Sequence, residues 1–317
     1  MADYYLDFEK SIKEIDLKIL ELESEGSSDD NSELLSLKTN RETILKEIYS
    51  NLTRWQRVQL ARHPQRPLSL DYINYMAPDF IELHGDRYYG DDKAVICGIA
   101  TLGKQKVVII GQQKGKNTKE NLLRNFGMMR PEGYRKALRI MKLAEKFNLS
   151  VITLLDTPGA YPGIGAEERG QGEAIARNLL EMSKLEVPII SIVIGEGASG
   201  GALGIGVCDK MIMLENTWYS VISPEGCASI LWRDAEKAPE AADAMKVMPD
   251  DLKKMGICDR IINETLGGAH REFDKVATKL KKVILEEIDL IRKNNTNSFL
   301  DRRIERYDKM GIFSESL

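Results

Sequence analysis

The segment best suited to chemistry is residues 195–206, where six glycines lie within twelve residues directly after an apolar run. Glycine lets the backbone approach a ligand closely. A helix that begins near Ser199 would leave its first amide N–H groups without partners, and its dipole would favour negative charge in front of them. The sequence therefore predicts that the amides of Gly200 and Gly201 stabilise a developing oxyanion. Tight packing of helix on strand is the structural alternative.

Two known motifs also match this segment. Residues 195–200 fit G-x-G-x-x-G, with Glu215 where a ribose-binding acid would stand. However, Glu196 would bring a carboxylate near the pyrophosphate, which argues against a dinucleotide site.

The second motif is G-x-S-x-G at residues 197–201, the pattern of a hydrolase nucleophile. Ser199 would then be the nucleophile, and His270 is the one histidine downstream of it. A helix N-cap is the more common role of such a serine. A serine hydrolase or peptidase nevertheless stays open as an alternative.

Positive charge gathers in the middle of an acidic chain. Residues 104–146 contain twelve Lys or Arg and three Glu, whereas the whole protein has a net charge of −4. The clustering indicates a phosphate- or carboxylate-bearing ligand or an acidic partner. Aromatic residues are not interleaved with it, so we expect no dedicated nucleic-acid site.

The elements that must position these residues alternate between strands and helices, which predicts βαβ units and a mainly parallel sheet. The expected strands are Ala94–Thr101, Lys106–Gly111, Val151–Leu155, Pro188–Ile194 and Lys210–Leu214, the first two as a hairpin. The expected helices are Pro131–Phe147, Ile164–Lys184 and Phe273–Lys293.

Three of the strands run into glycine-rich loops, at residues 111–115, 156–163 and 195–201. Ligands of parallel sheets bind beyond the carboxyl ends of the strands, where these loops would lie. The strands recur about every forty residues, which favours stacked ββα turns.

The ends of the chain differ from its middle. Apolar residues at helical spacing before and after the polar segment 23–32 predict an N-terminal helical hairpin, which would be either ordinary packing or a docking arm. We expect a helical arm over residues 1–60, a catalytic domain over 61–271 and a helical extension over 272–317. The tail beyond Asn294 is polar, and we expect it to be peripheral.

Composition excludes several classes of protein. The chain has 317 residues, 43% of them hydrophobic, and its apolar runs are shorter than the roughly 20 residues that cross a membrane. Residues 1–10 resemble no targeting signal, so we expect a cytoplasmic protein. Four widely spaced cysteines predict neither a metal site nor disulfides, and buried thiols are the usual case.

An ordered set of motifs identifies the chain as similar to a known family, the carboxyltransferase alpha subunits of acetyl-CoA carboxylase. The likeness runs from about Leu52 to Arg271. The motifs are Gly111-Gln-Gln-Lys-Gly115, Asn125-Phe-Gly127, residues 131–138, Asp156-Thr-Pro-Gly-Ala-Tyr-Pro-Gly163, residues 166–171, Ser199-Gly-Gly-Ala202, residues 223–229 and Leu266-Gly-Gly-Ala-His270.

The resemblance implies an α/β fold of the crotonase-like (ClpP/crotonase) kind, a spiral of ββα turns. It implies transfer of a carboxyl group from carboxybiotin, on the biotin carboxyl carrier protein, to acetyl-CoA, giving malonyl-CoA in the first committed step of fatty acid synthesis. The implied partners are a beta subunit, in an assembly of two alpha and two beta chains, and biotin carboxylase in the wider complex. Zinc would belong to the beta subunit, and no metal to this chain. A non-catalytic scaffold is the remaining alternative.

The resemblance also implies roles for particular residues. Gly200 and Gly201 would donate to the ureido oxygen of biotin. The path by which biotin enters would be lined by Pro158, Gly159, Gly163 and Gly165. The carrier or the phosphates of CoA would contact Lys114, Lys116 and Arg130. Two positions depart from the family pattern: Gln112 stands where histidine is frequent, and Ala198 where glycine is frequent.

Overall fold

A single sheet lies at the centre of the computed structural model, which describes residues 4–24, 32–293 and 298–311. Its strand order is β1-β2-β3-β4-β5-β6-β8, and β7 pairs with β5. The strands are β1 (Ile81–Glu82), β2 (Val95–Leu102), β3 (Gln105–Gln112), β4 (Ser150–Thr157), β5 (Ile189–Ala198), β6 (Lys210–Leu214), β7 (Trp218–Ser220) and β8 (Arg260–Ile262).

The sheet confirms the predicted hairpin and the predicted parallel strands. Strands β2 and β3 pair antiparallel from Val95 opposite Gln112 to Leu102 opposite Gln105. From β3 onward every pairing is parallel. The strand order follows the chain without a reversal, so the described sheet has no topological switch point at which a dinucleotide would bind.

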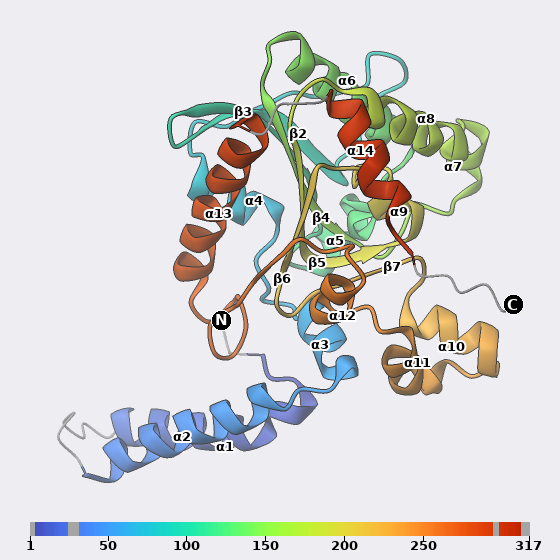
Figure 1. Ribbon diagram of the computed structural model, residues 1–317. Coiled ribbons are helices and arrows are strands. Elements are labelled where there is room, and N and C mark those ends of the chain that lie inside the picture. Colours follow the sequence, from blue (N-terminus) through green and yellow to red (C-terminus); the bar gives the residue numbers. More distant parts are fainter. Residues whose placement is uncertain (1–3, 25–31, 294–297, 312–317) are drawn as a thin grey trace, which may run out of the picture.

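Helices cover both faces of the sheet (Figure 1). They are α1 (Lys10–Ser24), α2 (Ser32–Ser50), α3 (Arg54–Ala61), α4 (Ser69–Met76), α5 (Thr118–Leu123), α6 (Pro131–Lys146), α7 (Ile164–Glu168), α8 (Gln171–Lys184), α9 (Ser199–Leu203), α10 (Pro224–Trp232), α11 (Ala238–Met245), α12 (Pro249–Lys254), α13 (Phe273–Lys293) and α14 (Phe299–Asp308).

Burial on both faces explains why the strands appear as short apolar runs in the sequence. Ile109, Ile152 and Ile190 pack in one core cluster with α4 and α13. Their chain neighbours point to the other face, where Val108 and Val151 pack in a second cluster with α6 and α8. Each strand therefore supplies apolar side chains alternately to two cores.

Helix α13 has the predicted bounds, and α6 ends one residue before its prediction. The prediction of one continuous helix over Ile164–Lys184 is wrong. Gly170 adopts φ +81°, a left-handed conformation that glycine takes without strain, and it separates α7 from α8. The break depends on the backbone angles of a single residue, which an apolar pattern does not show.

The N-terminal helical hairpin is present and projects from one end of the body (Figure 1). Ile15 and Ile19 of α1 pack on Leu34 of α2. Arg41, which interrupts the apolar stripe of α2, donates to the carboxylate of Asp16 on α1. Most of the segment predicted to break the two helices lies outside the described residues.

The expectation of a peripheral tail is wrong for residues 299–308. Arg303 of α14 is only 1% exposed. Its guanidinium donates to the carbonyl oxygen of Val187 at 2.6 Å and to the carboxylate of Asp209 at 3.0 Å. Arg303 therefore ties α14 to the segments that precede β5 and β6, and Arg306 and Tyr307 add hydrogen bonds to Asp259 and to the backbone of Cys208. A hydropathy pattern cannot detect such polar contacts.

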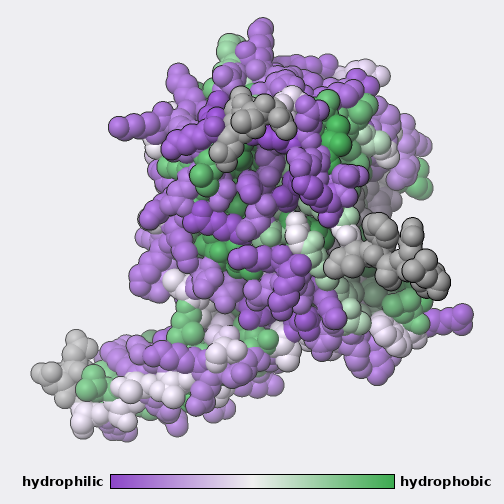
Figure 2. Space-filling model, in the orientation of Figure 1, coloured by the Kyte–Doolittle hydropathy of each residue, from purple (hydrophilic) through white to green (hydrophobic). Residues whose placement is uncertain are grey.

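The surface is largely hydrophilic on the face drawn in Figure 2, with hydrophobic residues in small patches. None of the described helices combines the length and apolar character needed to cross a membrane. Cys97, Cys208 and Cys258 are buried, as predicted, and Cys227 is half-buried.

We predict that Arg303→Met lowers the free energy of unfolding by about 3–5 kcal/mol, because the buried carboxylate of Asp209 loses its cationic partner. Chemical denaturation would measure this change. The matched control is Lys309→Met, which removes an exposed ion pair with Glu305 at the end of the same helix and should barely change stability. Equal losses from both variants would contradict the anchoring role.

Candidate active site

The predicted glycine-rich loops follow three neighbouring strands. Strands β3, β4 and β5 run parallel, so their carboxyl ends lie at the same edge of the sheet. Two of the loops touch: a Cβ atom built on Gly201 would lie 2.2 Å from the carbonyl carbon of Gly159. No side chain fits at position 201. The structure therefore brings two of the predicted site segments into backbone contact.

The turn from β5 into α9 is sharp. Ser199 adopts φ +56°, which is uncommon for a residue other than glycine. The prediction that Ser199 caps the helix is wrong, because buried Ala198 occupies the N-cap and no side chain caps this end of α9. The amides of Gly200 and Gly201 lie in the first turn, where a helix offers them no internal acceptor.

The two predicted donors differ in their surroundings. Gly201 is buried, whereas Gly200 is half-buried beside exposed Ser199. A Cβ atom on Gly200 would make only ordinary contact, 3.5 Å from Cδ1 of Ile175 on α8. Close packing thus accounts for glycine at position 201 but not at position 200. Position 200 is the more accessible of the two.

The residues predicted along the path of biotin fall into two groups. Gly159, which follows Pro158, adjoins Gly201 of α9. It has φ +153° and open space on the side where a Cβ atom would stand. Gly163 and Gly165 lie farther along, at the N-cap and inside α7. The structure brings Gly159 to the predicted donors and leaves Gly163 and Gly165 on the next helix.

Arg130 lies beside this second group. Its guanidinium is 4.6 Å from the ring centroid of Tyr161, and Tyr161 in turn packs against Gly163. Its Nη2 atom also donates to Asn125, in a short turn with positive φ angles. Arg130 is half-buried at this edge of the sheet.

Lys116 lies at the surface, with 63% of its side chain exposed, and its Nζ atom is 2.6 Å from the carboxylate of Asp71. Both residues border a cavity of about 460 Å³ that His270 and Phe273 also line. The cavity therefore adjoins the loop that follows β3. A cation on its rim suits an anionic group.

Lys114 occupies a different environment. Its Nζ atom lies 2.8 Å from the carboxylate of Asp156 and 2.7 Å from that of Glu196. Burial disfavours the charged form, but the two carboxylates raise the pKa of Lys114 above its ordinary value. The structure thus accounts for Lys114 as the centre of a buried ion cluster that joins the ends of β3, β4 and β5.

Arg62 completes this cluster. Its Nε atom donates to Glu196 at 2.7 Å, and its Nη1 atom contacts Glu225 at 2.5 Å. Burial raises the pKa of Glu196, yet Lys114 and Arg62 outweigh it and hold that pKa below its ordinary value. Lys114, Arg62 and Glu196 are therefore charged at neutral pH.

Sequence reasoning missed the partners of Lys114. Asp156 and Glu196 stand at the ends of apolar strand runs, and a buried carboxylate needs a cation. That signal indicates that a partner exists. The signal does not identify Lys114 or Arg62 as that partner, because both residues are remote from Glu196 in the chain.

The geometry gives Ser199 no histidine base. His270 stacks on His63 with ring centroids 4.0 Å apart, and His84 contacts Asp91. These are the three histidines of the chain, and none has a hydrogen bond to Ser199. Within the described ranges, no group of three His, Cys, Asp or Glu residues could hold a metal ion.

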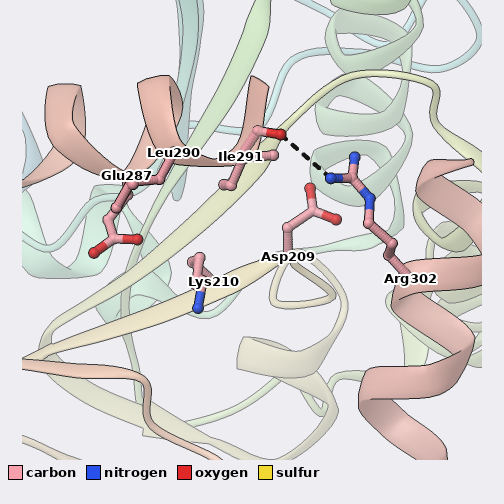
Figure 3. A pocket seen from close by; sticks show the side chains of 6 residues that line it. All are labelled: Asp209, Lys210, Glu287, Leu290, Ile291 and Arg302. Carbon is pink, nitrogen blue, oxygen red and sulfur yellow. Dashed lines mark hydrogen bonds between the residues drawn. The ribbon is translucent and has the colours of Figure 1, made fainter. Parts of the chain in front are cut away.

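Another cavity, of about 280 Å³, lies away from these loops (Figure 3). Its lining includes Asp209 and Lys210 at the amino end of β6, together with Glu287 of α13. Arg302 of α14 reaches the carbonyl oxygen of Ile291 across it. The amino ends of parallel strands lie opposite the glycine-rich loops, so this cavity is not the candidate site.

Known proteins share both this sequence and this fold. Residues 5–311 match the family model described as acetyl co-enzyme A carboxylase carboxyltransferase-like. The acetyl-coenzyme A carboxylase carboxyl transferase subunit alpha of Chlorobaculum parvum is 52% identical over 332 residues, 99% of each chain. Its counterpart in Aromatoleum aromaticum is 51% identical over 318 residues, again 99% of each chain.

Solved structures confirm the predicted crotonase-like α/β fold. A Pseudomonas malonate decarboxylase hetero-tetramer matches with a TM-score of 0.58 and 16% identity, over 75% of this chain and 92% of that one. Transcarboxylase 12S matches with a TM-score of 0.53 and 20% identity, over 67% of this chain and 41% of that one. The solved structures show the fold, and the sequence relatives show the family. This chain belongs to the family of acetyl-CoA carboxylase carboxyltransferase alpha subunits.

Proposed function

We propose that this chain supplies the carboxybiotin half of a carboxyltransferase active site and that a beta subunit supplies the acetyl-CoA half. The family match over residues 5–311 carries the proposal. The reaction is transfer of a carboxyl group from carboxybiotin on the biotin carboxyl carrier protein to acetyl-CoA, giving malonyl-CoA. The contact between the loops of Gly159 and Gly201 supports placing the biotin half here.

The main-chain amides at the start of α9 are the proposed machinery. Carboxybiotin, when bound, supplies the activated carboxyl group, and negative charge gathers on its ureido oxygen as the N–C bond breaks. The amides of Gly200 and Gly201 would donate to that oxygen. Donors fixed in advance stabilise such charge, and removing one typically costs about 2.7–4 kcal/mol in the barrier. Equivalent donors of the beta subunit would serve the thioester oxygen.

Room for the bicyclic ring is proposed beside Pro158 and Gly159, where nothing lies within 4 Å of the position that a Cβ atom of Gly159 would take. Gly163 and Gly165 would line the outer part of the path. Lys116 and Arg130 are proposed to contact the carrier or the phosphates of CoA, since both lie at this edge of the sheet. For Lys114 we propose a structural role instead, because its ammonium group is held between two carboxylates.

The assembly is part of the proposal. Two alpha and two beta chains would form the carboxyltransferase in the cytoplasm, with zinc on the beta chain and biotin carboxylase in the wider complex. Half of the active site would then be absent from the isolated alpha chain.

We predict that the chain alone does not convert malonyl-CoA and free biotin to acetyl-CoA and carboxybiotin, and that the chain mixed with its beta partner does. A coupled assay for acetyl-CoA would follow this reverse reaction. An inactive pair that forms a complex of the expected mass would refute the enzymatic role and favour a scaffold.

We predict that Gly200→Val lowers kcat of the pair by roughly 100-fold or more, because the side chain would stand beside the proposed donors. Assembly should persist, since a Cβ atom at position 200 meets only ordinary contacts. Gly201 is a poorer test, because any side chain there would strike the backbone of Gly159.

Gly172→Val is the matched control for this prediction. Gly172 also lies in the first turn of a helix, α8, and a Cβ atom there would meet nothing within 4 Å. This variant should keep wild-type kcat. Full activity of Gly200→Val in an intact complex would move the oxyanion donors to another part of the chain.

A further inference from the structure

Gln112, the last residue of β3, connects two of the loops that form the proposed site. Its side chain is fully buried. The Nε2 atom donates to the carbonyl oxygen of Gly201 at 2.7 Å, and the Oε1 atom accepts from the backbone N–H of Asp156 at 3.1 Å. A carbonyl can only accept and a backbone N–H can only donate, so these partners fix the orientation of the amide group.

We propose that Gln112 is a positioning residue for the reaction: its side-chain amide holds the first turn of α9 in register with the end of β4. The inference rests on the proposed function, because it concerns the amides assigned there to the oxyanion. Gln112 does not contact the reacting atoms in this proposal. It acts through the backbone of Gly201.

The need for such a residue follows from the composition of α9. Gly200 and Gly201 have no side chains to restrict their backbone angles, and glycine is the least restrained residue. Among the described residues, Gln112 is the one side chain that hydrogen-bonds to the backbone of residues 199–203. Oxyanion donors must be fixed before charge develops, and a misplacement of about 1 Å can cost roughly 100-fold in rate.

The backbone of Gln112 is held in place as well as its side chain. Its own carbonyl oxygen accepts from the hydroxyl of Ser69 at 2.6 Å, which ties the end of β3 to α4. Asp156, whose N–H donates to the side chain of Gln112, begins the loop that contains Gly159. The amide therefore spans from β3 to both segments that meet at the Gly159–Gly201 contact.

Gln113 offers a matched control because it repeats the same chemistry on the opposite side of the chain. Its Nε2 atom donates to the carbonyl oxygen of Lys114 at 2.8 Å, and its Oε1 atom accepts from the N–H of Leu70 at 2.8 Å. It is also buried. Replacing Gln113 removes a partly buried hydrogen bond of the same kind, to the backbone of Lys114, without touching α9.

The test is Gln112→Glu in the complete alpha–beta complex, assayed in the reverse direction with malonyl-CoA and free biotin. A carboxylate keeps the acceptor for Asp156 but cannot donate to Gly201. We expect kcat to fall roughly 10- to 100-fold at neutral pH while KM for malonyl-CoA stays unchanged. Gln113→Glu should keep wild-type kcat once the complex has formed.

The pH profile separates positioning from packing. Burial raises the pKa of a carboxyl group, and its protonated form donates again. The ratio of variant to wild-type kcat should therefore be highest at low pH and fall as pH rises. The charged groups on the three strand ends that meet here are Lys114, Asp156 and Glu196, which are paired with one another and present in both proteins. The ratio thus reports the introduced carboxyl.

Each outcome decides between the two proposals. An equal fall in both variants, a pH-independent ratio or an unchanged Gln112→Glu would overturn the role of Gln112 while wild-type activity upholds the proposed function. An inactive wild-type complex would instead refute the function itself.

Should Gln112→Glu fail to assemble, the variant Gln112→His provides the test, because a neutral imidazole also has one donor and one acceptor. An active His variant supports positioning, and an inactive one in an intact complex contradicts it.

Discussion

The buried ion cluster around Lys114 is the constraint on which the candidate site depends. Its ammonium group lies between Asp156 and Glu196, and Arg62, directly after α3, donates to Glu196. Such charges are costly to bury alone, and they remain there because each has a partner. The cluster joins the carboxyl ends of β3, β4 and β5, the three strands whose loops carry the glycines. Lys114 thereby has a role in the architecture of the site.

Above this cluster the site is built from backbone. Gly201 packs directly on Gly159, the amides of α9 begin beside this contact, and Gln112 joins the two segments through one side-chain amide. Residues of this kind contribute no acid, base or nucleophile. This agrees with a reaction in which stabilisation of a developing oxyanion supplies much of the rate enhancement. It also explains why an active site is hard to recognise here from polar side chains alone.

The sequence predicted the elements of the sheet well and the connections between them less well. Apolar runs predicted β6 and α13 with their observed bounds, because burial on one or two faces produces a clear periodicity. The break at Gly170 and the anchoring of α14 were missed. The first depends on the left-handed conformation of one residue. The second depends on polar contacts of Arg303, Arg306 and Tyr307, and neither feature produces a periodic signal.

By itself the sequence determined the family and the parallel sheet, because ordered motifs and local spacing are properties of the chain alone. It also proposed Gly200 and Gly201 as candidate oxyanion donors. Only the tertiary structure decided that Gly201 is required for packing against Gly159, that Lys114 is paired, and that Gln112 spans two loops. Each of these contacts joins residues more than 40 positions apart. The pairing of strands in the sheet brings these residues together, and a pattern along the sequence does not show which strands are paired.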